Sequence, residues 1–249
     1  MPSHEPSDTP PPYGTVIFDC DSTLSRIEGI EELARDCRAE VEELTRRAMD
    51  GELPLEDAYG ARLELICPSR ADLAAVAAHY TREALPHARE LVAALQFLGK
   101  RVAVVSGGLL AAVAPFANDL GITNSEDVHA VGMRFNADGT YHSFDSDSPL
   151  ARSGGKIPVV RAIAGAPDAG ASVLIGDGAT DLEAASEVAR FIGFGGVVAR
   201  DQVMREAAVT CRTADLAALL PHLLTTDERE LLRTSGTHSS LLEAAASAS

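Results

Sequence analysis

The 249-residue sequence predicts an α/β fold, in which a parallel β-sheet forms the core and a helical segment is inserted near the N-terminus. Three short apolar runs carry this prediction, at residues 15–18, 102–105 and 172–175. Each run is strand-like, ends in small or polar residues and is followed by a helical pattern. This alternation of strand, loop and helix indicates a parallel sheet whose strands are buried on both faces.

The first run ends in two acidic residues. Residues 16–24 read VIFDCDSTL, so Asp19 and Asp21 follow the apolar residues directly. Carboxylates at the end of a buried strand are costly to desolvate unless a cation meets them. The pair therefore predicts a cationic partner elsewhere in the chain.

Residues 25–85 differ in character from the rest of the chain. Amphipathic helical patterns fill them, with breaks at Gly51, Pro54 and Pro68. Too many helices intervene here for one crossover between parallel strands. We therefore expect a helical insert, called below the inserted segment, that is rooted in the sheet and can cover a crevice at its edge.

The second and third runs also end in polar groups. Residues 106–108 read SGG, and residues 176–181 read GDGATD. Ligands of parallel sheets bind beyond the carboxyl ends of the strands, so we expect these groups and the first two acids to meet in one crevice. Between the two runs, residues 131–145 alternate in polarity around Asp138-Gly139, which predicts a hairpin.

Together the polar groups suit phosphoryl transfer. Asp177 and Asp181 add carboxylates to the first pair, and an oxygen-rich site of this kind suits Mg²⁺ better than zinc. A carboxylate can also attack a phosphoryl group whose charge is neutralised by a metal and by hydrogen-bond donors. The sequence offers these donors and one cation: Ser106, the amides of Gly107 and Gly108, and Lys156.

In their order along the chain, these motifs resemble those of the haloacid dehalogenase-like superfamily, and specifically of its phosphoserine phosphatases. The resemblance covers residues from about Gly14 to Leu220 and implies a Rossmann-like α/β core with a helical cap. The matching motifs are DCDST at residues 19–23, SGG at 106–108, SGGK ending at Lys156, and GDGATD at 176–181.

The resemblance implies the catalytic roles. Asp19 would be the nucleophile that forms an aspartyl-phosphate, and Asp21 the acid for the leaving oxygen and then the base for water. Lys156 would act beside Asp19. Mg²⁺ would bind the Asp19 carboxylate, the Asp21 main-chain carbonyl and Asp177. The implied supporting residues are Thr23, Met49, Gly108 and Asp181.

Substrate recognition is implied for the inserted segment. Residues 45–66 resemble the corresponding family segment along their length. Glu28 matches the acid that receives the serine ammonium group, and Arg62 matches the arginine that receives its carboxylate. The implied contacts to the phosphate end of the substrate are Ser106, Gly107, Lys156 and Thr180.

Three departures from the family pattern leave the substrate open. Leu55 stands where many relatives have Phe, Pro86-His87 where Pro-Gly is common, and Val131 where an Asn is often found. The expected reaction is Mg²⁺-dependent hydrolysis of O-phospho-L-serine, the last step of serine biosynthesis. One alternative is the same chemistry on another small phosphomonoester, by hydrolysis or phosphotransfer. A second is a catalytically silent phosphate-binding domain.

Composition excludes several other functions. The formal net charge is −16 and no basic cluster is visible, so nucleic acid is not an expected partner. No apolar stretch approaches the roughly 20 residues that span a bilayer, and the N-terminus lacks the pattern of a secretory signal. The scattered cysteines signal neither a zinc site nor a disulfide framework. We therefore expect a cytoplasmic enzyme, with a homodimer left open.

The expected domain organisation follows from these patterns. Residues 13–24 and 86–225 should form the α/β catalytic core, and residues 25–85 the helical cap. The N-terminal residues 1–12 and the C-terminal residues 226–249 lack a packed pattern, so we expect a disordered leader and a partly disordered tail.

Overall fold

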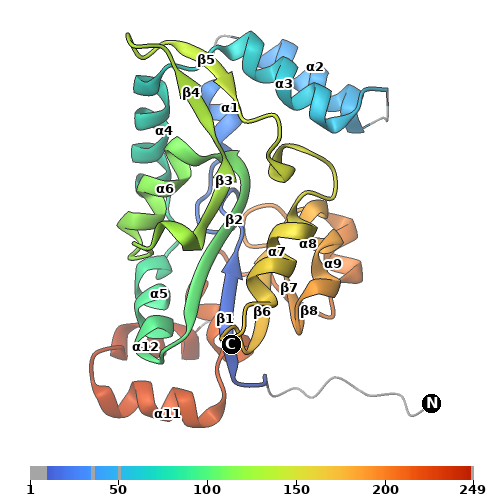
Figure 1. Ribbon diagram of the computed structural model, residues 1–249. Coiled ribbons are helices and arrows are strands. Elements are labelled where there is room, and N and C mark those ends of the chain that lie inside the picture. The colour runs from blue at the N-terminus through green and yellow to red at the C-terminus, as the bar shows by residue number, and fades with distance from the viewer. Residues whose placement is uncertain (1–9, 35–36, 50–51, 248–249) are drawn as a thin grey trace, which may run out of the picture.

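A six-stranded parallel β-sheet forms the centre of the structure, in the order β3-β2-β1-β6-β7-β8 (Figure 1). The computed structural model describes residues 10–34, 37–49 and 52–247. The parallel pairing of each neighbouring pair of strands confirms the predicted α/β class. The strands are β1 (Tyr13–Phe18), β2 (Arg101–Leu109), β3 (Val128–Val131), β6 (Ala171–Gly176), β7 (Arg190–Phe194) and β8 (Val209–Cys211).

The three strands predicted from the sequence are neighbours in this sheet. β1 pairs with β2 on one side and with β6 on the other, so that Phe18 lies opposite both Val104 and Ile175. The sheet grows from β1 first in one direction and then in the other. In doubly wound sheets, ligands bind where the winding direction changes, beyond the carboxyl ends of the strands. The topology therefore points to the end of β1.

Side chains of β1 are buried on both faces of the sheet. Val16 and Phe18 belong to one apolar cluster and Ile17 to the other, and all three are fully buried. This alternation is what a central parallel strand requires. Helices cover both faces of the sheet. They are α5 (Ala88–Phe97), α6 (Leu110–Asp119), α7 (Lys156–Ala164), α8 (Ala179–Glu183), α9 (Asp201–Glu206) and α10 (Leu220–Leu223).

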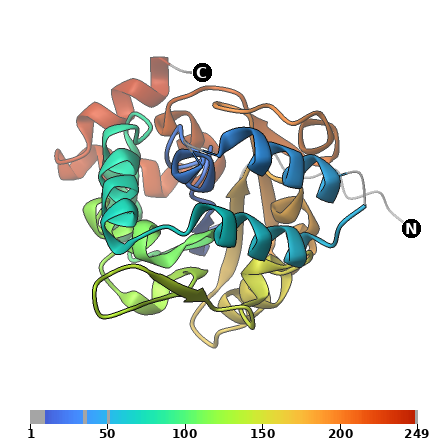
Figure 2. The same ribbon diagram turned by 90° about the horizontal axis from the view of Figure 1, so that it is seen from above.

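The inserted segment is helical where the structure describes it. Helices α2 and α3 lie beyond the carboxyl edge of the sheet, whereas α4 packs along core helix α6 (Figures 1 and 2). A bridge between Ser25 and Ala84 joins the two ends of the segment. The division into core and cap stays a prediction, and α4 is packed as part of the core. The helices are α1 (Gly29–Leu33), α2 (Arg38–Met49), α3 (Leu55–Ile66) and α4 (Arg70–Arg82).

A two-stranded hairpin supports the inserted segment from the core. Strands β4 (Met133–Phe135) and β5 (Tyr141–Phe144) pair antiparallel, which confirms the predicted hairpin. Gly139 in its turn has a φ of 85°, a conformation that favours glycine. The ring of Phe144 lies 5.6 Å from that of Tyr59, so the hairpin contacts helix α3.

Residues 226–247, which belong to the tail expected to be partly disordered, are largely helical. They form helices α11 (Thr226–Ser235) and α12 (Ser239–Ser247), shown in red in Figure 1. Thr225 begins α11 with a capping box, and Leu232 and Leu241 are fully buried in the core. The few apolar residues of this tail are spaced so that they face the core. Overall composition, which is polar here, does not reveal such spacing. Residues 248–249 and most of the predicted disordered leader, residues 1–9, lie outside the described residues.

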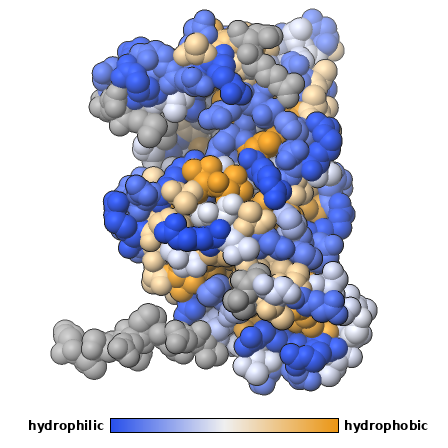
Figure 3. All heavy atoms as spheres, turned by 180° about the vertical axis from the view of Figure 1, so that it is seen from behind, coloured by the Kyte–Doolittle hydropathy of each residue, from blue (hydrophilic) through white to orange (hydrophobic). Residues whose placement is uncertain are grey.

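One face of the molecule is shown by hydropathy in Figure 3. On the face shown in Figure 3, hydrophilic side chains predominate and apolar ones form small groups between them. Within the described ranges, no helix combines the length and the apolar character that crossing a membrane requires. Among the side chains that the structure describes, the exposed large hydrophobic ones are Leu65, Phe97, Val198 and Leu231.

Candidate active site

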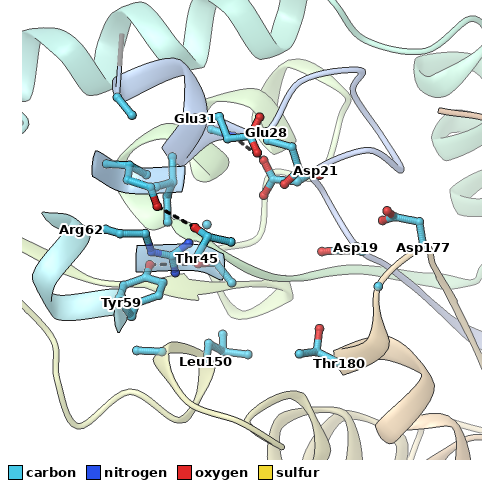
Figure 4. A pocket seen from close by; sticks show the side chains of 18 of the residues that line it. Asp19, Asp21, Glu28, Glu31, Thr45, Tyr59, Arg62, Leu150, Asp177 and Thr180 are labelled. Atoms are coloured by element: carbon cyan, nitrogen blue, oxygen red, sulfur yellow. Dashed lines mark hydrogen bonds between the residues drawn. The ribbon is translucent and has the colours of Figure 1, made fainter. Parts of the chain in front are cut away.

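The polar motifs meet in a pocket at the carboxyl edge of the sheet, as the sequence predicts. Its volume is about 530 Å³, and core and inserted segment both line it. Figure 4 shows Asp19 and Asp177 at one side of this pocket and Arg62 at the other. Residues that directly follow β1 and β6, and a residue of α3, therefore face one cavity although they lie far apart in the sequence.

The second motif is positioned by the end of a strand rather than by a loop. β2 continues through Ser106 and Gly107 to Leu109, beyond the predicted end at Val105. Its pairing with β3 is irregular between Val105 and Leu109. The Gly108 amide donates to the Ser106 hydroxyl over 2.9 Å, and Gly107 and Gly108 line the pocket beside this buried side chain.

Lys156 is the cation that the two acids at the end of β1 predict. Its Nζ lies 2.8 Å from Oδ1 of Asp19 and 2.7 Å from Oδ1 of Asp181, and all three side chains are buried. Burial opposes the charge on the ammonium group, but the two carboxylates outweigh burial and raise the pKa of Lys156. Lys156 therefore stays a cation beside Asp19.

A glycine places this lysine. Lys156 is the first residue of α7, and Gly155 precedes it. A Cβ at Gly155 would lie 1.7 Å from the carbonyl oxygen of Pro149, so only glycine fits this approach. The SGGK motif thus has a packing reason as well as a chemical one.

Asp177 completes an acidic cluster suited to a divalent cation. Oxygens of Asp19, Asp177 and Asp181 lie within 4.8 Å of one another, and all three residues are buried. Thr23 donates its hydroxyl to Asp177 over 3.1 Å, and the guanidinium of Arg200 pairs with the other oxygen of Asp177. Closely spaced carboxylate oxygens are the ligands that hard divalent cations prefer.

Asp21 turns its carboxylate away from this cluster. Its Oδ1 accepts the Gly29 amide over 2.7 Å and the Tyr80 hydroxyl over 2.6 Å, while Oδ2 faces the Ser106 hydroxyl at 3.3 Å. Burial, followed by the charges of Glu28 and Asp19, raises the pKa of Asp21 to about 7. A carboxyl group with such a pKa can both donate and accept a proton near neutral pH.

Two side chains of opposite charge face the pocket from the inserted segment. Glu28 accepts the Ser22 hydroxyl over 2.7 Å and lies 3.4 Å from the guanidinium of Arg200. Arg62 stacks over the Tyr59 ring at 5.5 Å from its centroid. Within the part of the chain that the structure describes, its buried Nε has no hydrogen-bond partner, and burial lowers its pKa. An anion in the pocket would satisfy this guanidinium.

The remaining predicted residues divide by position. Gly107 and Thr180 line the pocket, and the Gly107 carbonyl accepts the Tyr59 hydroxyl over 2.9 Å. The side chains of Met49 and Leu55 lie outside the described residues.

Two of the departures from the family pattern lie away from the pocket. Val131 is fully buried in the apolar core. His87 has a φ of 59° and pairs with Asp215 at 2.8 Å. Its left-handed conformation explains why glycine would suit this position.

Sequence reasoning missed two residues of the site. Arg200 contacts both Glu28 and Asp177, and the sequence motifs gave it no role. One signal in the sequence indicated a further cation: the site motifs contain more carboxylates than cations. Tyr80 reaches Asp21 from α4, where its helical position resembles an ordinary core residue and gives no signal.

Comparison with known proteins gives one consistent result. The haloacid dehalogenase-like hydrolase family matches residues 16–186. A phosphoserine phosphatase of Mus musculus is 44% identical over 194 residues, which cover 77% of this chain and 86% of that protein. A chloroplastic phosphoserine phosphatase of Arabidopsis thaliana is 37% identical over 211 residues, covering 83% of this chain and 71% of the relative.

A solved structure agrees. The structure of a phospho-aspartyl intermediate analogue of phosphoserine phosphatase superposes with a TM-score of 0.70 at 26% identity, covering 86% of this chain and all of that chain (100%). The family match, the sequence identity and the fold all indicate the same family. The chain belongs to the haloacid dehalogenase-like hydrolases and, within them, to the phosphoserine phosphatase family.

Proposed function

We propose that this chain hydrolyses O-phospho-L-serine to L-serine and phosphate, the last step of serine biosynthesis, with Mg²⁺ as its cofactor. The observation that carries the proposal is that an acid, Glu28, and a guanidinium, Arg62, line the same pocket as Asp19. Phosphoserine carries one ammonium and one carboxylate beside its phosphate. The relatives described above carry the name phosphoserine phosphatase.

The chemistry follows from the residues at the end of β1. An oxygen of Asp19 attacks phosphorus, the bond between phosphorus and the serine oxygen breaks, and Asp21 donates a proton to that leaving oxygen. Asp21 then takes a proton from water, whose oxygen attacks the aspartyl-phosphate and releases phosphate. Lys156, 2.8 Å from Asp19, balances negative charge throughout.

Further groups of the pocket hold the phosphoryl oxygens. Ser106, the Gly107 amide and Lys156 are the proposed donors, and Thr180 lines the same cavity. A divalent cation held by Asp19, Asp177 and the Asp21 carbonyl would neutralise phosphoryl charge. The oxygen-only ligand set favours Mg²⁺ over zinc. Asp181 keeps Lys156 in place through their 2.7 Å contact.

The inserted segment supplies recognition of the amino acid. Arg62 would bind the serine carboxylate, which would satisfy its unpaired Nε. Glu28 would receive the ammonium group, exchanging its contact with Arg200 for one with substrate. We place the enzyme in the cytoplasm, because the four cysteines, Cys20, Cys37, Cys67 and Cys211, are all free thiols.

Phosphate release from a panel of phosphomonoesters tests the proposal. The panel contains L-phosphoserine, D-phosphoserine, phosphothreonine and an aryl phosphate, each with Mg²⁺ and with a chelator. Asp19→Asn should abolish release from every compound. Arg62→Ala should lower kcat/KM for L-phosphoserine about 100-fold, because the carboxylate of the bound substrate loses its charged partner. The kcat/KM for the aryl phosphate, which has no carboxylate, should stay within about threefold of the wild-type value.

Arg70→Ala is the matched control. Its guanidinium also lies over an aromatic ring, that of Phe135 at 4.7 Å, but it does not line the pocket, so both substrates should be unaffected. Turnover of the aryl phosphate with no preference for phosphoserine, and with Arg62→Ala harmless, would assign another phosphomonoester. If no compound releases phosphate, the result would favour the alternative of a catalytically silent phosphate-binding domain.

A further inference from the structure

The two oxygens of the Asp21 carboxylate have different surroundings. Oδ1 accepts two hydrogen bonds, from the Gly29 amide at 2.7 Å and from the Tyr80 hydroxyl at 2.6 Å. Oδ2 lies 3.3 Å from the Ser106 hydroxyl, and a Cβ at Gly108 would come within 3.1 Å of it. Oδ2 therefore faces the motif that is proposed to hold the phosphoryl group.

An oxygen that already accepts two donors cannot take a proton without losing one of them. Oδ2 is thus the oxygen free to carry a proton to and from a reacting group. We propose that Tyr80 is a positioning residue for the proposed phosphatase reaction: its hydroxyl, with the Gly29 amide, fixes Asp21 so that Oδ2 delivers the proton to the leaving oxygen. This inference rests on the proposed role of Asp21 as the acid.

Tyr80 is held rigidly on the core side of the pocket. Its side chain is almost fully buried, and its ring stacks on Phe116 of α6 with centroids 5.4 Å apart. The next residue, Thr81, donates to Asp119 of the same core helix over 2.7 Å, and Ser25 donates to the Tyr80 carbonyl over 3.2 Å. Movement of α2 and α3 would therefore leave the hydroxyl in place.

The sequence makes room for this hydroxyl. A Cβ at Gly29 would lie 2.2 Å from the Tyr80 oxygen, so any larger residue would push the ring away from Asp21. Gly29 thus serves twice, as an amide donor to Oδ1 and as the space that the tyrosine needs. This space allows the hydrogen bond between Tyr80 and Asp21, which lie 59 residues apart in the sequence.

Leaving groups of graded basicity test the role of Tyr80. The serine alkoxide is a poor leaving group that needs a proton, whereas a nitrophenolate leaves without one, so only the former depends on a well-placed acid. Tyr80→Phe keeps the ring and its stacking. It should lower kcat/KM for L-phosphoserine about 30-fold and for 4-nitrophenyl phosphate less than about threefold. Across a series of aryl phosphates, the dependence on leaving-group pKa should become steeper.

Tyr59→Phe is the matched control. Its hydroxyl also joins the inserted segment to the core, but it donates to the Gly107 carbonyl rather than to Asp21. It should leave the leaving-group dependence across the aryl phosphates unaltered. Thermal unfolding of both variants shows whether they fold as the wild type does.

The outcomes separate this inference from the proposed function. An unaltered leaving-group dependence in folded Tyr80→Phe overturns the positioning role. A wild type that cleaves aryl phosphates but ignores phosphoserine overturns the proposed substrate, and the graded series still decides on Tyr80. A wild type that cleaves no phosphomonoester overturns both.

Discussion

Nζ of Lys156 lies 2.8 Å from Oδ1 of Asp19, and both side chains are buried at the end of the central strand. The same ammonium group lies 2.7 Å from Asp181, so one cation serves two carboxylates. A buried carboxylate left without a counter-charge is strongly destabilising. The ion pair therefore links the stability of the fold to the chemistry of the pocket.

Lys156→Met should reduce both stability and activity. Asp181 and Asp19 would lose their cation, so the free energy of unfolding should fall by about 3–5 kcal/mol. Urea unfolding measures this change. Arg161→Met, in the same helix, is the control: Arg161 is exposed and pairs with Glu187 at 2.8 Å, so its loss should cost less than about 1 kcal/mol.

A double variant separates the two effects of Lys156. Adding Asp181→Asn to Lys156→Met removes one of the two uncompensated charges, so part of the lost stability should return. Activity should stay at the level of the single variant, because Asp19 and the phosphoryl oxygens still lack the ammonium group. Return of phosphate release together with stability would contradict a chemical role for Lys156.

The sequence predicted the central part of the fold because that part is encoded locally. Runs of apolar residues buried on both faces mark β1, β2 and β6, and the polar residues at their ends are necessarily brought together by a parallel sheet. Asp19, Asp177 and Lys156 were accordingly placed in one site from the sequence. The contacts in the pocket agree with that expectation.

Other features depend on contacts between distant segments, which no local pattern reveals. In the sequence, Tyr80 resembles an ordinary core residue of α4. Its hydroxyl can donate to Asp21 only because Gly29 leaves space for it there. Arg200 reads as a surface charge, and its role depends on Glu28 lying nearby. The C-terminal tail has a polar composition. Its few leucines are core residues because α11 and α12 pack against the rest of the core.

Adjacent leucines of α11 test the packing of this helix against the core. Leu232 is fully buried, whereas Leu231 is 57% exposed. Leu232→Ala should lower the free energy of unfolding by about 3 kcal/mol, because it leaves a cavity in the core, and Leu231→Ala by less than about 0.5 kcal/mol. Urea unfolding compares them. Equal effects would mean that α11 does not pack against the core in solution.

Gly155→Ala tests the packing reason for the SGGK motif. The new methyl would overlap the Pro149 carbonyl, so the start of α7 must shift and carry Lys156 with it. We expect a loss of about 1–3 kcal/mol in stability and a fall in kcat/KM for an aryl phosphate. Gly132→Ala is the control, because its Cβ would meet Asp145 at an ordinary 3.5 Å. Similar activities of the two variants would argue against this steric account.

Binding of Mg²⁺ should stabilise the folded protein through the acidic cluster. At about 100 times the dissociation constant, a ligand specific for the folded state adds about 2.7 kcal/mol, a rise in Tm of about 5–10 °C for a chain of this size. Asp177→Asn should remove the rise, whereas Asp138→Asn, in the exposed hairpin turn, should keep it. Thermal unfolding with Mg²⁺ and with a chelator measures both. An equal rise in wild type and Asp177→Asn would place the cation elsewhere.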